Sequence, residues 1–173
     1  TPVAGVSLFE RYGSTAANVQ IVCEPSRTWA IVGETVENFR PNCIDEANGC
    51  TSPLTMDVAT VEALPGQFRR VGIWQSQSAI VMSDGSSVVE VSNDIRDKFD
   101  PKHVNYVGAS VLPTCSGWID SVHNENSRDI PGTTIWVYDI LRKQWSEKPL
   151  VATKRLSCGR SVYDTSGIPY SYG

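Results

Sequence analysis

The chain of 173 residues lacks two features that would place it at a membrane or on nucleic acid. A membrane-spanning helix needs about 18 or more consecutive apolar residues, and no run approaches that length. The 15 Lys and Arg residues stand singly or in pairs, and the net charge is −4. A phosphate backbone is bound by clustered basic residues. We therefore expect neither membrane insertion nor nucleic-acid binding.

The sequence also lacks the usual spacings of metal and nucleophile sites. It has two His, no C-x-x-C, no H-x-x-x-H and no G-x-S-x-G. Zinc sites and serine nucleophiles commonly carry such motifs. The loop with Asp45, Glu46 and Asn48 offers oxygen atoms to calcium, but not in the order of a calcium-binding loop. We expect no metal and no cofactor.

Five cysteines are an odd number for a chain of this size. Cys43 and Cys50 flank a polar loop with an Asn-Gly turn signal, and this spacing predicts a local disulfide. Cys23, Cys115 and Cys158 then supply one long-range bridge and one free thiol, or three buried thiols. A disulfide favours an oxidising, extracellular setting. The sequence has no Asn-x-Ser/Thr sequon to support that placement.

The clearest local pattern is a hairpin within residues 68–91. Asp84-Gly85 separates two runs rich in β-branched residues, and a two-residue turn there pairs Met82 with Ser87. Strand side chains alternate between the two faces of a sheet. The predicted buried face carries Ile80, Met82, Val89 and Val91, and the opposite, partly solvated face carries Ala79 and Glu90.

Short strand patterns recur along the chain, separated by Gly, Pro and Asn. This rhythm predicts one all-β domain over 1–173, an antiparallel β-sandwich or β-barrel of about nine to ten short strands. One short helix is expected near 92–99, and residues 41–53 and 120–132 are expected as surface loops. The strand predictions cover residues 6–11, 17–23, 28–32, 35–39, 57–64, 104–112, 117–122, 133–140 and 161–163, with a further strand from about 144. For residues 57–64, two turns of helix that end at Pro65-Gly66 are the alternative.

One stretch has a local likeness to a known family. Trp136-Val-Tyr-Asp139, followed six residues later by Trp145-Ser-Glu147, resembles one strand-turn-strand unit of a kelch-type propeller blade. A propeller needs several copies at a period near 50 residues, and no second copy is visible in the sequence. We therefore interpret the stretch as an ordinary hairpin with aromatic cross-strand partners.

Two sets of residues are candidates for a site. Asp120, His123 and Glu125 could supply a general acid and base, the basis of an alternative function as a small secreted hydrolase. A solvated loop explains the same residues without any catalysis. Trp74 and Trp118, with Asn124 and Asn126, are the candidate ligand-binding residues, because rings beside amides bind sugars. Burial of these tryptophans in the core is the competing interpretation.

These observations favour a non-catalytic exterior domain, either secreted or projecting from a virion or capsid. Its expected partner is a cell-surface glycan or a protein receptor, and homo-oligomerisation is compatible with this role. The alternative is the small hydrolase, and a third interpretation is a structural or assembly protein. These three classes differ in the surface that each needs: an exposed ring beside loops, a cleft with converging carboxylates, or a flat apolar patch.

Overall fold

The computed structural model describes residues 1–12, 15–33, 35, 37–51, 53–98, 105–112, 116–122, 133–139, 142–149, 160–163, 165 and 169–172. The protein is mostly antiparallel β-sheet, which confirms the all-β prediction, and the sheets do not close into a barrel. The described strands are β1 (Ala4–Tyr12), β2 (Thr15–Cys23), β3 (Thr28–Val32), β4 (Arg40–Asp45), β5 (Asp57–Leu64), β6 (Gln67–Gln75), β7 (Ile80–Ser83), β8 (Val88–Glu90), β9 (Asn105–Leu112), β10 (Ser116–Val122), β11 (Thr133–Asp139), β12 (Gln144–Pro149), β13 (Arg160–Tyr163) and β14 (Pro169–Tyr172). Two short 3-10 segments are η1 (Pro53–Thr55) and η2 (Asn93–Lys98). The helix predicted near 92–99 is present as 3-10 turns that are kinked at Ile95 (φ −124°, ψ 21°).

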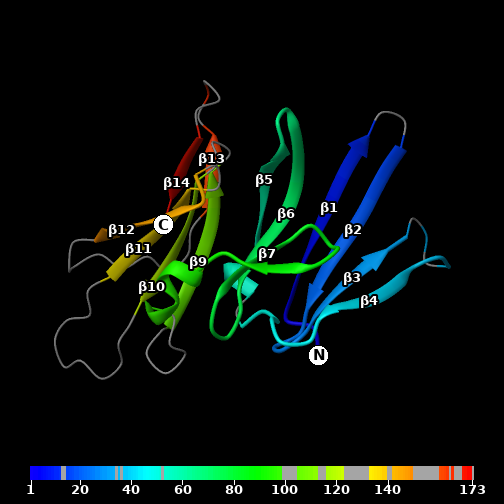
Figure 1. Ribbon diagram of the computed structural model, residues 1–173, viewed down its shortest axis with the longest axis horizontal. Coiled ribbons are helices and arrows are strands. Elements are labelled where there is room, and N and C mark those ends of the chain that lie inside the picture. Colours follow the sequence, from blue (N-terminus) through cyan, green and yellow to red (C-terminus); the bar gives the residue numbers. More distant parts are fainter. Residues whose placement is uncertain are drawn as a thin grey trace.

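The strands form sheets in chain order. Sheet A is β1-β2-β3-β4, sheet B is β5-β6-β7-β8, and sheet C pairs β9, β10, β11 and β12 in the same consecutive way. Sheet D is the pair β13-β14. Each strand pairs antiparallel with the next one, so each of the first three sheets is a four-stranded meander. The sheets follow one another across the molecule, from sheet A at one side to sheets C and D at the other (Figure 1).

The first strands of the sheets form an internal repeat. They begin at Ala4, Asp57, Asn105 and Arg160, about every 50 residues. β1 contacts β5, β5 contacts β9, and β9 contacts β13. Four-stranded meanders repeated in chain order, with their first strands side by side, resemble consecutive blades of a β-propeller. The sequence does not show this repeat, but the backbone does.

The predicted aromatic hairpin is the last pair of strands in sheet C. β11 pairs with β12, and Tyr138 lies directly opposite Trp145. Their ring centroids are 4.8 Å apart, so the aromatic cross-strand partners predicted for this stretch are confirmed. The hairpin belongs to one of the repeated meanders rather than standing alone.

Sheet B lies between sheets A and C, and its side toward sheet A is closely packed around Trp74. Trp74 and Val81 are 0% exposed and lie in one cluster with Leu8, Ile21 and Cys23 of sheet A. The partly solvated face predicted for the hairpin is therefore wrong at Ala79, which is buried, whereas Glu90, opposite Val81 on this face, is only partly buried. The alternation of side chains in the sequence predicts which residues share a face of the sheet. Whether that face is buried depends on the packing of a neighbouring sheet against it.

The other side of sheet B packs toward sheet C. Val71 and Ala59 are buried together with Tyr138 of β11. Ile80 forms a second cluster with Ile95 of η2, against which Met82 and Val91 are packed. The grouping of Ile80, Met82 and Val91 on one face is thus confirmed. Val89 shares this face, since it pairs with Met82, but its predicted burial is wrong, because Val89 is 56% exposed.

The register of the central hairpin differs from the prediction. Met82 pairs with Val89 rather than with Ser87, so four residues, 84–87, connect the strands. The Asp84 carboxylate accepts hydrogen bonds from the backbone N–H and the hydroxyl of Ser86, which stabilises the wider loop. Gly85 has the predicted positive φ, +92°. The shift is by two residues, which preserves the face on which each side chain lies.

The region predicted as a surface loop over 41–53 is partly a strand. β4 pairs with β3 and forms the edge of sheet A, where Pro41 is tolerated. The strand predicted for 35–39 is instead a turn, closed by a hydrogen bond from Asn38 N to Thr35 O. The polar residues of 41–53 predicted a loop where β4 lies. An edge strand such as β4 needs few apolar side chains, so polar composition does not exclude it. Of the other predicted loop, 120–132, residues 120–122 belong to strand β10 instead, and residues 123–132 lie outside the described part.

The predicted Cys43–Cys50 disulfide is absent. Cys23, Cys43 and Cys50 are free thiols. Cys50 is fully buried in the core beside Trp74, whereas the Cys43 thiol lies on β4 against the Asp45 carbonyl. The two cysteines point to different surroundings because β4 continues through Cys43 and the chain turns only afterwards. Cys115 and Cys158 lie outside the described residues.

Candidate functional site

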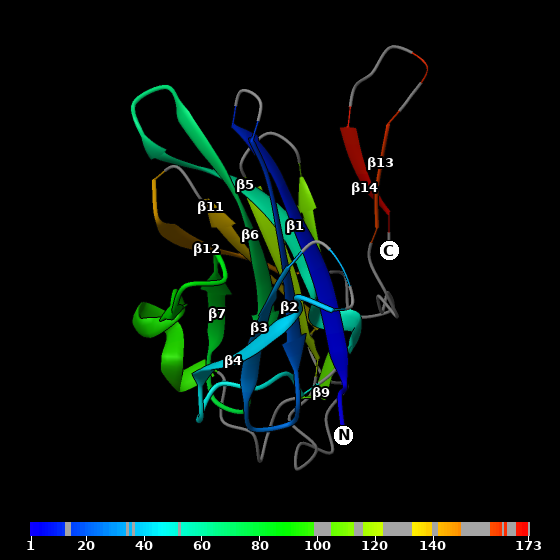
Figure 2. The same ribbon diagram turned by 90° about the vertical axis from the view of Figure 1, so that its right-hand side faces the viewer.

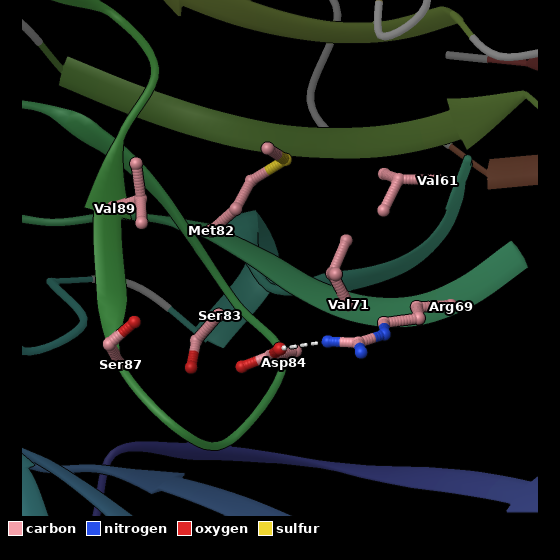
Figure 3. Close-up of a pocket in the computed structure, with 8 residues that line it drawn as sticks. All are labelled: Val61, Arg69, Val71, Met82, Ser83, Asp84, Ser87 and Val89. Carbon is pink, nitrogen blue, oxygen red and sulfur yellow. Dashed lines mark hydrogen bonds and ion pairs between the residues drawn. The ribbon is translucent and has the colours of Figure 1, made fainter. Parts of the chain in front are cut away.

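A groove on sheet B is lined by residues of all four of its strands, β5 to β8. It has a volume of about 220 Å³ (Figure 3). Its apolar walls come from Val61, Val71, Met82 and Val89. Each of these four side chains comes from a different strand of the same sheet, so the meander assembles the groove from residues up to 28 positions apart.

Polar groups line one end of the groove. Asp84 and Ser87 come from the β7–β8 connection, Ser83 is the last residue of β7, and Arg69 comes from β6. The Arg69 guanidinium donates to the Asp84 carboxylate at 3.2 Å, as the dashed line in Figure 3 shows. The groove therefore combines an aliphatic surface with one exposed ion pair.

The ionisation of Asp84 is set by competing effects. Partial burial raises the pKa of this carboxyl group, but hydrogen bonds from Ser86 and the charge of Arg69 outweigh it, and the pKa lies below its ordinary value. Asp84 is therefore ionised at neutral pH, and its oxygens are already hydrogen-bonded to groups of the protein. A carboxylate in this state is a poor general acid.

The predicted ligand-binding residues are not brought together at this groove. Trp74 is fully buried between sheets A and B, and its indole N–H donates to the Gly49 carbonyl at 3.2 Å. The prediction of Trp74 as a surface ring is wrong, because the neighbouring sheet A covers that face of β6. Trp118 lies on β10, opposite Val137 and Ser110.

The predicted catalytic residues are only partly within the described structure. Asp120 lies on β10 at a register shift between β10 and β9, opposite Ile135 of β11. His123, Asn124, Glu125 and Asn126 lie outside the described residues, so the acid-base and the Trp118–Asn predictions stay predictions.

The acidic loop after β4 is internally bonded. Asp45 accepts hydrogen bonds from the backbone N–H groups of Ala47 and Asn48, both at 2.7 Å, and from the Asn48 side chain at 3.1 Å. Burial raises the pKa of Asp45, but these hydrogen bonds outweigh it, and the pKa is lowered. Within the described part of the chain, no group of three or more His, Cys, Asp or Glu residues could hold a metal ion.

Sequence reasoning missed the groove itself. Val61, Met82 and Val89 were assigned to strands, but only the observed register sets them beside Arg69 and Asp84. The Asp-Gly turn was the one available signal for its polar end.

No protein-family model matches the chain, and no curated protein matches it. Among the residues that the structure describes, no helix has the length and apolar character needed to cross a bilayer.

Proposed function

We propose that this protein is a non-catalytic recognition module whose groove on sheet B binds an extended segment of a protein partner. The groove with its aliphatic walls is the observation that carries this proposal. Sugar sites generally use aromatic ring faces, and none of the described residues that line this groove is aromatic. A protein partner is therefore favoured over the glycan that the sequence suggested equally.

The surroundings of the groove suit an extended peptide. β8 is the edge strand of sheet B, and Val89 on this strand is 56% exposed. An added strand can pair with such an edge, while alternate side chains enter a neighbouring pocket. An aliphatic side chain of the partner would enter the space between Val71 and Met82, and Arg69 would meet a carbonyl or carboxylate beside it.

A displayed library of random peptides, probed with the folded protein beside a glycan array, tests this function. We expect selected peptides with a recurrent Val, Leu, Ile or Met, and loss of their binding in Val89→Asp. Phe68→Asp is the matched control, because Phe68 is 58% exposed on the same sheet but does not line the groove. Glycan binding that is lost in Trp118→Ala and kept in Val89→Asp would overturn the proposal.

The exterior location remains a prediction. The described thiols are free, so the disulfide no longer supports it. Attachment to a partner through the groove does not depend on the compartment.

A further inference from the structure

Two cysteines lie in the core that joins sheets A and B. Cys23 ends β2, and Cys50 belongs to the connection between β4 and η1. Both are thiols, both are 0% exposed, and both belong to the cluster that contains Trp74. Sheet A lies in front of sheet B in Figure 2, so the two thiols are enclosed between these layers. Neither of them lines the groove.

The segment that carries Cys50 is held against the residue that follows Cys23. The backbone N–H of Cys50 donates to the Glu24 carbonyl at 2.9 Å. Gly49 packs so closely that a Cβ atom there would overlap the same carbonyl. The indole N–H of Trp74 donates to the Gly49 carbonyl and fixes the segment from the side of sheet B. Neighbouring strands joined by such bonds lie about 5 Å apart, and a disulfide spans Cα separations of about 4–7 Å.

A hydroxyl group connects the Cys23 thiol to the same segment. The Thr28 hydroxyl donates its hydrogen atom to the Asn48 carbonyl at 2.6 Å, so its oxygen accepts from the Cys23 thiol, 3.4 Å away. Burial raises the pKa of the Cys23 thiol to about 12, the Thr28 hydrogen bond lowers it, and nearby Cys50 raises it further. The last effect agrees with the proximity of two thiols in one cluster.

We propose that Cys23 and Cys50 are a redox-active pair, which closes into a disulfide when a small-molecule disulfide oxidises the protein. Both thiols lose their protons and together lose two electrons, and a bond forms between the two sulfur atoms. The S–S bond of the oxidant breaks, and its two halves leave as thiols that carry these protons and electrons. The new bond would fasten the segment 48–50 covalently to the end of β2 and close the contact between sheets A and B around Trp74.

Cys43 does not compete for this bond, although it is nearer to Cys50 in the sequence. Its thiol donates to the Asp45 carbonyl. It lies opposite Trp29, on the side of sheet A away from the cluster, because Ala30, which alternates with Trp29, is the buried residue. Tertiary packing rather than sequence spacing therefore defines the pair.

Oxidation is best tested while the chain folds, because buried thiols react slowly. The full chain, reduced and unfolded, is refolded in oxidised glutathione, the remaining thiols are alkylated in denaturant, and peptides are mapped without reductant. We expect Cys23 joined to Cys50, and an alkylated Cys43. Any other state of Cys23 and Cys50 in the folded product, whether alkylated or bonded elsewhere, would overturn the proposal.

Two variants and the urea midpoint check the role of the bond. Cys43→Ser should keep the bond between Cys23 and Cys50, whereas Cys50→Ser should leave Cys23 alkylated. The oxidised wild type should unfold at a higher urea concentration than the reduced protein, because the bond closes a loop in the unfolded chain. Reductant should remove this difference, and Cys43→Ser should show the same shift as the wild type. An unchanged or lower midpoint in the oxidised protein would contradict a closure that stabilises the contact between sheets A and B.

Discussion

The indole N–H of Trp145 donates a hydrogen bond of 2.6 Å to the carbonyl of Val91, 54 residues earlier in the chain. Val91 follows β8 in sheet B, and Trp145 lies on β12 in sheet C, so this bond joins two consecutive meanders. Val91 in turn donates its own N–H to the Ile80 carbonyl at 2.9 Å. The contact between these sheets thus combines apolar packing with a specific polar link.

Replacement of Trp145 by Phe keeps a ring opposite Tyr138 but removes the donor. We expect the free energy of unfolding to fall by about 1–2 kcal/mol, because a partly buried carbonyl loses its partner. Trp29→Phe makes the same chemical change at an indole that bonds to Glu24 at the periphery, and should destabilise the protein clearly less than Trp145→Phe. Urea titration at low protein concentration measures both, and equal losses would contradict a special role of Trp145.

A comparison of Gly85 with Gly66 separates the cost of backbone strain from the cost of overpacking. Both glycines have positive φ, +92° and +76°, but only at Gly85 would a Cβ atom run into the Val19 side chain of sheet A. We expect Gly66→Ala to cost about 1 kcal/mol through backbone strain alone. Gly85→Ala should cost about 2–4 kcal/mol, because overpacking is added to strain. Thermal and urea unfolding of the two variants would check this order, and the reverse order would count against the packing of this hairpin on sheet A.

Cys23 should make stability depend on alkaline pH. Burial raises the pKa of this thiol to about 12, an effect that the Thr28 hydrogen bond opposes and nearby Cys50 reinforces. The unfolded state releases the proton near pH 9, so the contribution to stability is complete below pH 9 and falls between pH 9 and 12. The fall should approach about 1.4 kcal/mol per pH unit at its steepest.

The variant Cys23→Ala removes the contribution of this thiol to the pH dependence of stability and leaves the contributions of tyrosine and lysine residues unchanged. Urea unfolding at several pH values should show a shallower decline in Cys23→Ala than in the wild type, and an unchanged decline in Cys43→Ala. Parallel declines in all three proteins would show that the Cys23 thiol ionises as easily in the folded protein as in the unfolded chain.

Gln75 is fully buried, and its side-chain amide N and O atoms have no hydrogen-bond partner in the described part of the chain. Burial of an unbonded amide costs about 1–3 kcal/mol. We expect Gln75→Leu to stabilise the protein by about 1 kcal/mol or more. Gln144→Leu, at an exposed position, is the control and should change stability little. A destabilised Gln75→Leu variant would indicate that a buried water molecule bonds this amide.

Most of the strands could be predicted from the sequence. Residues 57–64 and 28–32 form strands over the predicted bounds, because alternation of side chains and β-branched content are local properties. β4 was missed, because an edge strand is held by its backbone hydrogen bonds to β3 and carries polar side chains. The pairing of Tyr138 with Trp145 was predictable, because a short turn fixes the register of two neighbouring strands.

The sequence by itself determined the class of structure and the direction of side chains within each strand. Ile80 and Met82 were assigned to one face, which remains correct even though the hairpin register shifts by two residues. The tertiary structure decided which faces are covered, because burial depends on the neighbouring sheet and not on the strand. Trp74 and Trp29 show the difference, because each lies opposite an aliphatic residue on the neighbouring strand. Trp74 is fully buried between sheets A and B, whereas Trp29, on the side of sheet A away from sheet B, is only partly buried.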